Sequence, residues 1–355
     1  MGRELFSKPC RIGINHLSDK QFVANGYILY NDWAHDVLFC AKVRFFNDST
    51  IILIFAPSNT LINMTQPIPA SQLVLNAEGA VYHLNLHPDQ LADTVIMVGD
   101  PGRVDMIASF FDKIEVKRQN RELVSRTGYF HGKRITALST GMGTDNLDIV
   151  MNELDTLANI DLKTRMPKDE HKSLNLIRIG TCGALQPDIE VGQNVATRYA
   201  IGLDGLIYFY EKSKEVNEIA MRDAFIKQMD YPTDLPKPYV VEGSKKLFDQ
   251  LAQGYYKGVT ATAPGFYGPQ GRTLRMHLAY PELNHKIEAF EHEGWRVCNF
   301  EMESSALYGL GKMMGHNCLT ICVAIANRVT EKFATDYHPF IKKLVLDTLE
   351  RLSNT

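Results

Sequence analysis

The chain has 355 residues, of which 45% are apolar and 22% are charged, and its formal net charge at pH 7 is −3. A chain of this length and composition can bury the core of one large globular domain or of two small ones. The charges are spread along the chain, so no basic stripe indicates nucleic-acid binding and no polybasic arm indicates a membrane surface. An anionic substrate would have to be held by individually placed arginines.

The cysteines and the N-terminal segment indicate a cytoplasmic protein. There is no Cys-x-x-Cys pair, and several cysteines lie inside apolar runs, as is typical of reduced, buried thiols. No basic segment followed by a long apolar one opens the chain, and the longest early apolar run, Ile51 to Pro57, is far too short to span a bilayer. The 6 cysteines are Cys10, Cys40, Cys182, Cys298, Cys318 and Cys322.

Residues 1–63 differ from the rest of the chain, because short apolar patches alternate there with polar stretches and no motif emerges. One hypothesis is that Met64 is the physiological start, so that residues 1–63 are an appended extension and not part of the native protein. The alternative is a small strand-containing extension that packs on the main domain. N-terminal sequencing or the intact mass of the native protein would decide between them. In either case residues 64–355 form the main domain.

From about residue 80 onward, short apolar runs alternate with helical patterns, first a strand at Thr94–Val98 and then a helix that reaches Phe111. This alternation predicts one α/β domain with a central, mostly buried sheet. Polar loops are expected at Lys163–Lys172 and Tyr231–Pro238. The later strands are expected at Arg134–Leu138, Leu176–Ile179, Gly192–Tyr199, Lys257–Ala263, Val297–Phe300 and Leu319–Ala326, and the later helices at Asn146–Ala158, Glu303–Met314 and Pro339–Leu352.

Glycine-rich turns follow three of the predicted strands. Gly99-Asp100-Pro101-Gly102-Arg103 opens a helix, where free backbone amides favour an anion and Arg103 adds a cation. Residues 139–146 form a second strand-to-helix turn. In the third, Arg178 interrupts an apolar strand just before Gly180-Thr181-Cys182-Gly183, and a buried arginine needs either a carboxylate or an anionic ligand. One such turn commonly does no more than reverse the chain, but three together predict a ligand site at the carboxyl ends of the strands.

Two carboxylates, Glu301 and Glu303, follow the apolar segment that ends at Phe300. In an extended chain, residues two apart point to the same side, and a carboxylate can accept hydrogen bonds from two neighbouring hydroxyls. The alternative is a plain helix start, where acidic residues suit the helix dipole.

The chain resembles the nucleoside phosphorylase family, whose members include uridine phosphorylase and purine enzymes. Three motifs carry the resemblance and occur in the family's order: residues 99–103, residues 178–184 and Glu301-Met302-Glu303-Ser304. The likeness extends from about residue 80 to the C-terminus. It implies a single three-layer α/β domain, with a central mixed β-sheet flanked by helices, and a pentosyltransferase that uses inorganic phosphate as co-substrate.

The resemblance also implies roles for individual residues toward phosphate and ribose. Guanidinium groups suit a phosphate dianion because they stay protonated and donate two hydrogen bonds at once. Arg121 and His83 would reach in from a neighbouring subunit, so that self-association would complete the site. The phosphate ligands would be Gly99, Arg103, Arg121, Arg178 and Thr181, and the ribose ligands would be His83, Met302 and Glu303.

For the base, the resemblance points to residues 265–272 and to uridine. Phe266 would lie against the pyrimidine, while Gln270 pairs with its amide edge and Arg272 donates to a carbonyl oxygen; Cys182 and Gly183 would complete the base site. A glutamine offers the donor and the acceptor that O2 and N3–H of uracil require. The alternative is a plain glycine- and proline-rich surface loop. Residues 326–328, Ala-Asn-Arg, stand where purine phosphorylases carry an aspartate, so purine chemistry lacks its usual acid.

The sequence departs from the family in places. Gly268-Pro269 reverses the familiar order, Cys182 stands where bacterial uridine phosphorylases often have threonine, and Asn146 replaces a serine. No metal or organic cofactor is expected. The exchange at Asn146 leaves open a structural monovalent cation at a subunit interface.

The expected reaction is phosphorolysis of uridine to uracil and ribose 1-phosphate, with Arg178, Glu303, Arg272 and Gln270 as the groups that act on the reactants. The glycosidic bond would loosen first, and catalysis would come from positioning and electrostatics. The rival hypotheses are a purine nucleoside phosphorylase or a nucleosidase of the same fold, and a non-catalytic nucleoside-binding protein. The sequence leaves three questions open: whether deoxyuridine or thymidine is accepted, whether the assembly is a dimer or a hexamer, and what residues 1–63 do.

Overall fold

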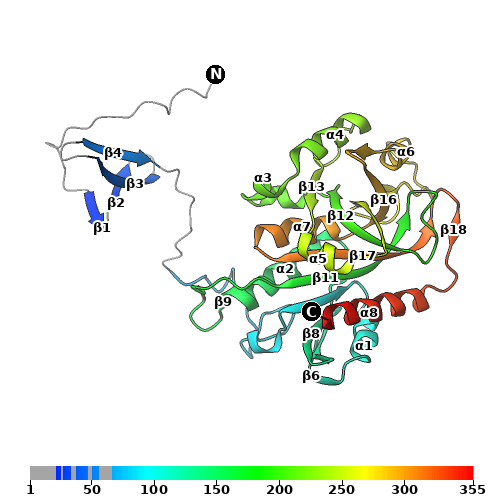
Figure 1. Cartoon of the computed structure of the whole chain (residues 1–355), viewed down its shortest axis with the longest axis horizontal. Helices are drawn as coiled ribbons and strands as arrows, with labels where there is room; N and C mark the ends of the chain where they lie inside the picture. The colour runs from blue at the N-terminus through cyan, green and yellow to red at the C-terminus, as the bar shows by residue number, and fades with distance from the viewer. Residues whose placement is uncertain (1–20, 25–26, 33–36, 47–49, 56–65, 355) are drawn as a thin grey trace. The chain divides into compact units, whose positions relative to one another are not determined.

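The computed structural model of the chain describes residues 21–24, 27–32, 37–46, 50–55 and 66–354 (Figure 1). The chain forms two compact units, Met1–Gln66 and Pro67–Thr355. Met64, which the sequence suggests as a start, lies outside the described residues, so that hypothesis stays a prediction.

In the first unit, four strands form an antiparallel meander in the order β1-β2-β3-β4. These are β1 (Gln21–Ala24), β2 (Tyr27–Asp32), β3 (Val37–Phe46) and β4 (Thr50–Phe55).

The second unit is built on a sheet of 12 strands in the order β15-β16-β14-β12-β17-β11-β5-β8-β7-β6, with β13 paired to β12 and β18 to β17. Parallel pairs join β11 to both β17 and β5, while the β6–β7–β8 end is antiparallel. An added antiparallel pairing of β11 with β16 closes the strands from β16 to β11 into a barrel. The strands are β5 (Thr94–Val98), β6 (Lys113–Asn120), β7 (Leu123–Phe130), β8 (Lys133–Ser139), β11 (Asn175–Ala184), β12 (Asn194–Gly202), β13 (Tyr239–Glu242), β14 (Tyr256–Thr262), β15 (Glu291–His292), β16 (Trp295–Glu301), β17 (Asn317–Asn327) and β18 (Lys332–Phe333).

Helices cover both faces of this sheet (Figure 1). On one face, α2 (Thr144–Asn159) packs on α7 (Ser304–Met313), and apolar residues at helical spacing along α2, from Leu147 to Leu157, form their common core. On the other face, α1 (Pro101–Ala108), α5 (Lys245–Leu251) and α8 (His338–Ser353) share a second core. The remaining helices are α3 (Ser213–Val216), α4 (Ile219–Met229) and α6 (Leu283–Glu288), and a two-stranded ribbon joins β9 (Ile160–Asp161) to β10 (Met166–Pro167).

The predicted α/β fold with a central mixed sheet between helical layers is confirmed. Thr94–Val98 is a strand with the expected bounds, and the helix expected from residue 146 begins at Thr144. The helix expected to reach Phe111 ends at Ala108. Residues 231–238 form a loop as predicted, whereas the loop expected at 163–172 contains the short strand β10.

The sequence reasoning missed the antiparallel hairpin of β6 and β7. Strand β6 lies at the end of the sheet and is rich in charged residues, and no residue in it is fully buried. Such a strand lacks the apolar run by which the central strands are recognised. Strand β11 also runs beyond Ile179 and ends at Ala184. The glycine-rich motif at residues 180–183 is therefore part of the sheet and does not form a loop.

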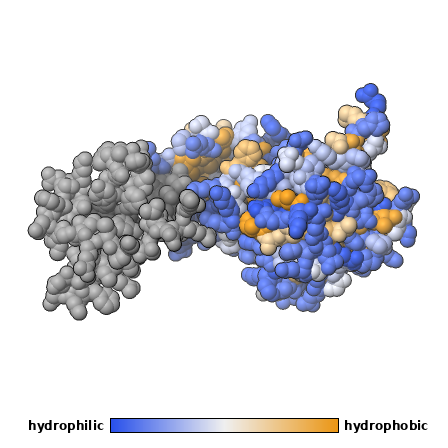
Figure 2. All heavy atoms as spheres, turned by 90° about the horizontal axis from the view of Figure 1, so that it is seen from above, coloured by the Kyte–Doolittle hydropathy of each residue, from blue (hydrophilic) through white to orange (hydrophobic). Residues whose placement is uncertain are grey.

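Figure 2 shows one face of the described region, where hydrophilic residues predominate and apolar ones stand in small groups between them. This is usual for the surface of a globular protein. Large apolar side chains that are exposed include Met142, Phe266 and Phe333, all of which line the pocket described below. None of the helices in the described part of the chain combines the length and apolar character that crossing a membrane requires.

Candidate active site

A pocket of about 630 Å³ lies where β5, β11 and β16 end. The carboxyl ends of strands are where α/β sheets commonly bind ligands, because the backbone turns away there and leaves a crevice. The pocket brings together eleven of the predicted site residues: Gly99, Arg103, Arg178, Thr181, Cys182, Gly183, Phe266, Gln270, Arg272, Met302 and Glu303.

One side of the pocket is the turn from β5 into α1. Asp100 caps this helix by accepting a hydrogen bond from the Gly102 amide at 2.8 Å. Gly99 lies close to the neighbouring turn, since a Cβ there would come within 3.3 Å of the Gly141 carbonyl oxygen. Arg103 projects from the first turn of α1 and lines the same pocket. This side offers the Arg103 guanidinium to an anion, whereas the Gly102 and Arg103 amides already donate to Asp100.

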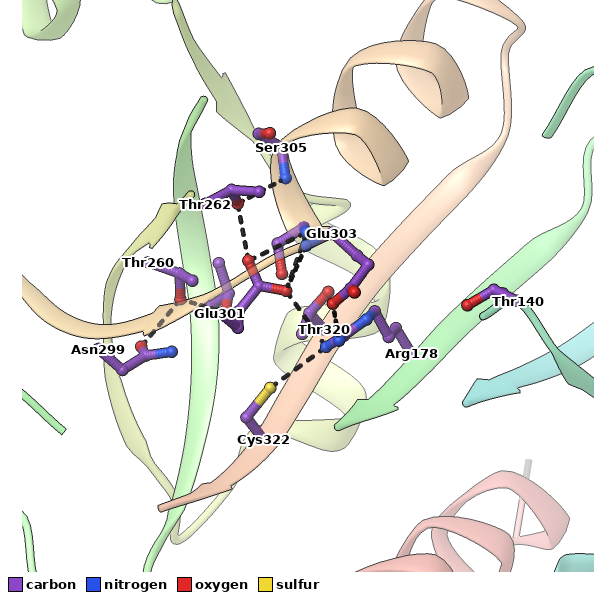
Figure 3. Close-up of polar contacts among 12 residues, drawn as sticks. Thr140, Arg178, Thr260, Thr262, Asn299, Glu301, Glu303, Ser305, Thr320 and Cys322 are labelled. Atoms are coloured by element: carbon purple, nitrogen blue, oxygen red, sulfur yellow. Dashed lines mark hydrogen bonds and ion pairs between the residues drawn. The ribbon is translucent and has the colours of Figure 1, made fainter. Parts of the chain in front are cut away.

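Arg178 lies beside Glu301, Glu303 and Cys322 (Figure 3). It forms the floor of the pocket, and its side chain is only 6% exposed. Its Nη1 lies 3.2 Å from Glu301 and 3.4 Å from the Cys322 sulfur, and its Nη2 donates to Glu303. Burial by itself would lower the pKa of Arg178, but the charges of the two carboxylates outweigh burial and raise it. The guanidinium is thus a permanent cation, and its buried Nε has no partner.

Gly180 is required beneath this guanidinium. A Cβ at that position would lie 2.3 Å from Nη1 of Arg178, which is far inside van der Waals contact. The glycine two residues after Arg178 in the predicted motif therefore has a packing reason: the arginine side chain folds back over its own strand.

Glu303 lies between the arginine and the turn before α2. Its Oε1 accepts from the Gly143 amide at 2.8 Å, and its Oε2 accepts from Arg178. Burial raises the pKa of this carboxyl, Arg178 opposes the rise, and Glu301 adds to it. The side chain is buried at the pocket wall with Met302 beside it. A carboxylate placed in this way can accept hydrogen bonds from a polyhydroxylated ligand.

The loop after β14 forms the opposite wall. Gln270 is buried and accepts a hydrogen bond from Nη1 of Arg272 at 2.7 Å, so its amide is held in one orientation. Arg272 also stacks on Phe266, with its guanidinium 3.9 Å from the ring centroid, while Phe266 stays 51% exposed. Burial and the nearby Arg328 lower the pKa of Arg272. Arg328 anchors the loop by donating to the Gln270 carbonyl oxygen.

His83 and Arg121, the two residues predicted to come from another subunit, are not among the residues that line this pocket. The ring Nδ1 of His83 lies 2.7 Å from Oε1 of Glu153, and Asn120 donates from its side chain to the His83 carbonyl oxygen at 3.2 Å. Arg121 follows Asn120 at the tip of the β6–β7 hairpin. These contacts bring the two predicted residues to one region of the surface, and their role toward a second pocket stays a prediction.

A cluster of Asp155, His171 and His316 has the composition of a metal site. The Leu174 amide donates to Nδ1 of His316 at 3.2 Å, which places the ring proton on Nε2, the atom 3.2 Å from Asp155. Metal-bound imidazoles instead donate from their second nitrogen. Because Nδ1 of His316 accepts rather than donates, the cluster does not fit a metal ligand set, and none of its residues lines the pocket.

Sequence reasoning missed Glu122 and Phe333, which line the pocket, whereas Met142 belongs to the predicted turn at residues 139–146 and lines it as well. Phe333 arrives on β18, which pairs with β17 beside Ala326, and no motif marks it. Glu301 was seen as half of a carboxylate pair, but its i and i+2 spacing from Glu303 was the only signal of its place in the site.

Comparison with known proteins places this pocket in context. The family model described as the phosphorylase superfamily matches residues 93–352. A uridine phosphorylase of Thermococcus kodakarensis is 30% identical over 278 residues, which cover 76% of this chain and 86% of that relative. A purine nucleoside phosphorylase of the DeoD type from a Thermoanaerobacter species is 38% identical over 255 residues, covering 71% and 90%. A solved Trypanosoma brucei nucleoside phosphorylase, described as showing uridine phosphorylase activity, is similar with a TM-score of 0.69 at 29% identity, covering 80% of this chain and 100% of that one.

Proposed function

The chain belongs to the phosphorylase superfamily, and from this premise we propose that it cleaves uridine with inorganic phosphate, releasing uracil and ribose 1-phosphate. The observation that carries the proposal is the pairing of Gln270 with Arg272 on the wall opposite Arg178 and Glu303. One pocket thus holds a donor–acceptor group for a pyrimidine edge and a cationic floor for phosphate.

Phosphate is bound between α1 and the pocket floor. The guanidinium of Arg103, in the first turn of α1, neutralises it from one side. The guanidinium of Arg178 donates to it as well, and Thr181 lines the same pocket. Several fixed donors hold the phosphate oxygens, so the nucleophile is positioned before the reaction.

Ribose lies over Met302 and Glu303, whose carboxylate accepts hydrogen bonds from the sugar hydroxyls. The bond to the base loosens first, and C1′ gains the positive character of an oxocarbenium ion. Negative charge develops on the departing uracil, where Arg272 and Gln270 stabilise it. Phosphate then bonds to C1′ from the opposite face. The N-glycosidic electron pair leaves with uracil, and phosphate supplies the pair for the new C–O bond.

A purine nucleoside phosphorylase is the second candidate, since one relative with that name is 38% identical. The residue at the position of the purine acid argues against it. Both ends of the Asn327 side chain are engaged: its Nδ2 donates to the carbonyls of Gln186 and Ile189 at 2.8 and 2.7 Å, and its Oδ1 accepts from the amides of Val329 and Thr330 at 2.9 Å each. Asn327 is a structural residue of the turn, and an amide cannot protonate a purine.

The deciding experiment measures base release from uridine, inosine and adenosine, each with and without phosphate. We expect phosphate-dependent cleavage of uridine. Preference for inosine would overturn the assignment of Gln270 and Arg272, and phosphate-independent cleavage would favour a nucleosidase. Tight nucleoside binding without cleavage would support the non-catalytic alternative.

We also propose that subunits share their active sites, with His83 binding the ribose and Arg121 the phosphate of a neighbour's pocket. The argument is that both residues sit together on the surface and outside the pocket of their own subunit. Mixing Arg121→Ala subunits with Glu303→Gln subunits tests this, because a mixed assembly would contain intact sites. Recovery of activity on mixing is expected, and its absence in a verified mixed oligomer would contradict shared sites.

The described cysteines, all free and buried, suit a reducing compartment, so we propose that this reaction takes place in the cytoplasm.

A further inference from the structure

We propose that Glu301 is a positioning residue, which holds the Arg178 guanidinium at the pocket in the position from which it binds phosphate. This inference rests on the proposed function, because it assigns to Glu301 a part in the phosphate half of the same site. The geometry that supports it is the arrangement of donors around the Glu301 carboxylate (Figure 3).

Glu301 is surrounded by donors. Its side chain is 1% exposed. Its Oε1 accepts from the Thr262 hydroxyl at 2.7 Å, and its Oε2 accepts from the Glu303 amide at 3.0 Å. The Ser304 amide is shared between the two oxygens at 3.1 and 3.0 Å, and Nη1 of Arg178 lies 3.2 Å from Oε2. Every contact is a donor, so the group is a carboxylate held rigidly from several directions.

The two carboxylates that flank Arg178 therefore differ in how many further hydrogen bonds they can accept. Glu301 is occupied by β14, by the start of α7 and by Arg178. Glu303 has two backbone donors, Gly143 and Met302, in addition to Arg178, against the four donors around Glu301. Glu303 can thus turn acceptor capacity toward a sugar, whereas Glu301 acts on the reactants only through the arginine.

The two carboxylates hold Arg178 from both sides. Its guanidinium already lies against Gly180 and cannot move further toward that residue. If Glu301 released Nη1, the guanidinium would turn toward Glu303 as its remaining carboxylate partner. That rotation would shift the guanidinium from its place at the pocket and would also occupy the carboxylate needed for ribose. A displacement of about 1 Å in such a group can reduce turnover on the order of 100-fold.

Two substitutions separate position from charge. Glu301→Gln keeps the shape: with its oxygen at the Oε2 position it still accepts from Glu303, Ser304 and Arg178. Its NH₂ at the Oε1 position can donate to the Thr262 hydroxyl, since a hydroxyl accepts as well as donates. Glu301→Asp keeps the charge but withdraws the carboxylate by about 1.5 Å, one carbon–carbon bond.

We expect Glu301→Asp to lower kcat/KM for phosphate about 10- to 100-fold, with a smaller change in KM for uridine. Glu301→Gln should retain most of that activity. In Glu301→Gln the acid limb of the pH–rate profile should move to lower pH, because the charge of Glu301 contributes to the raised pKa of Glu303. A residue that only stabilises the fold would not produce this contrast.

Tyr308→Phe is the matched control for general loosening. It removes hydrogen bonds of the same helix α7, to Thr197 and Thr320, and touches neither Arg178 nor Glu303. All variants would be compared by thermal unfolding with and without inorganic phosphate. We expect phosphate to raise the melting temperature of the wild type and of Glu301→Gln, and to do so much less for Glu301→Asp.

The outcomes distinguish the two proposals. If the wild type shows neither phosphate-dependent cleavage nor stabilisation by phosphate, the proposed function fails, and this inference fails with it. If the wild type shows both and Glu301→Asp behaves like it, the positioning role alone is wrong. Loss of the phosphate response in Glu301→Gln but not in Glu301→Asp would also overturn it, since charge and not position would then matter.

Discussion

Replacing Glu303 by glutamine tests the ribose half of the site most directly. Its carboxylate accepts from Gly143 and Arg178, and in the proposed complex also from the ribose 2′- and 3′-hydroxyls. A hydrogen bond to a charged group contributes roughly 1.5–3 kcal/mol, so losing one corresponds to about a 10- to 100-fold loss in kcat/KM for uridine. Arg178 is less suitable for this test: removing it would leave two buried carboxylates unpaired, a change that typically destabilises by about 3–5 kcal/mol.

The assay compares uridine with 2′-deoxyuridine in both proteins, so that enzyme and substrate form a thermodynamic cycle. The wild type should discriminate between the two substrates more strongly than Glu303→Gln, because the variant has already lost part of the partner for the 2′-hydroxyl. Thermal unfolding monitors the separate loss of stability from donors left without an acceptor, about 1–3 kcal/mol. Equal discrimination by both proteins, or unchanged uridine cleavage in the variant, would refute contact between Glu303 and the ribose.

Other predictions concern the base loop, the arginine, the titration of the site and the core. Gln270→Ala should lower kcat/KM for uridine about tenfold or more, because the pyrimidine edge loses its fixed partner. Gly180→Ala should lower phosphate affinity, because the new Cβ would lie 2.3 Å from Nη1 of Arg178. Cleavage should fall on acidification through a pKa above 4.5, because burial raises the pKa of Glu303 and protonation removes its acceptor capacity. Tyr308→Phe should destabilise by about 1–3 kcal/mol in urea unfolding and keep activity, because it leaves Thr320 N–H and the Thr197 carbonyl unpaired.

Each of these has a clear contrary result. Steady-state kinetics showing unchanged uridine cleavage in Gln270→Ala would remove that residue from base recognition. Phosphate titration of Gly180→Ala that matches the wild type would mean that the guanidinium can move without loss. A pH–rate profile flat from neutrality down to 4.5 would show that Glu303 need not be ionised or is not perturbed. An inactive but stable Tyr308→Phe protein would indicate a role for α7 beyond packing.

Much of the fold could be predicted because its central elements have strong local patterns. β5 is a continuous apolar strand ending at a glycine-rich turn, and α2 carries apolar residues at helical spacing. The β6–β7 hairpin could not be predicted in this way. Its first strand is charged and partly exposed, and its position depends on pairing with β7, which in turn pairs with β8. Strand pairing across the sheet is a tertiary property that a short window of sequence does not contain.

By itself the sequence determined the chemical groups and their order along the chain: an arginine before a glycine in β11, a carboxylate pair after β16, and a glutamine and an arginine two residues apart after β14. These are local facts, since each motif depends on neighbours a few residues away. Only the tertiary structure decided that Arg178 would lie between Glu301 and Glu303, more than a hundred residues later in the chain, and that Gln270 would face the same pocket. The physical reason is burial. A guanidinium this far from solvent must find its countercharges in space, and it is the barrel closure between β11 and β16 that brings those charges to it.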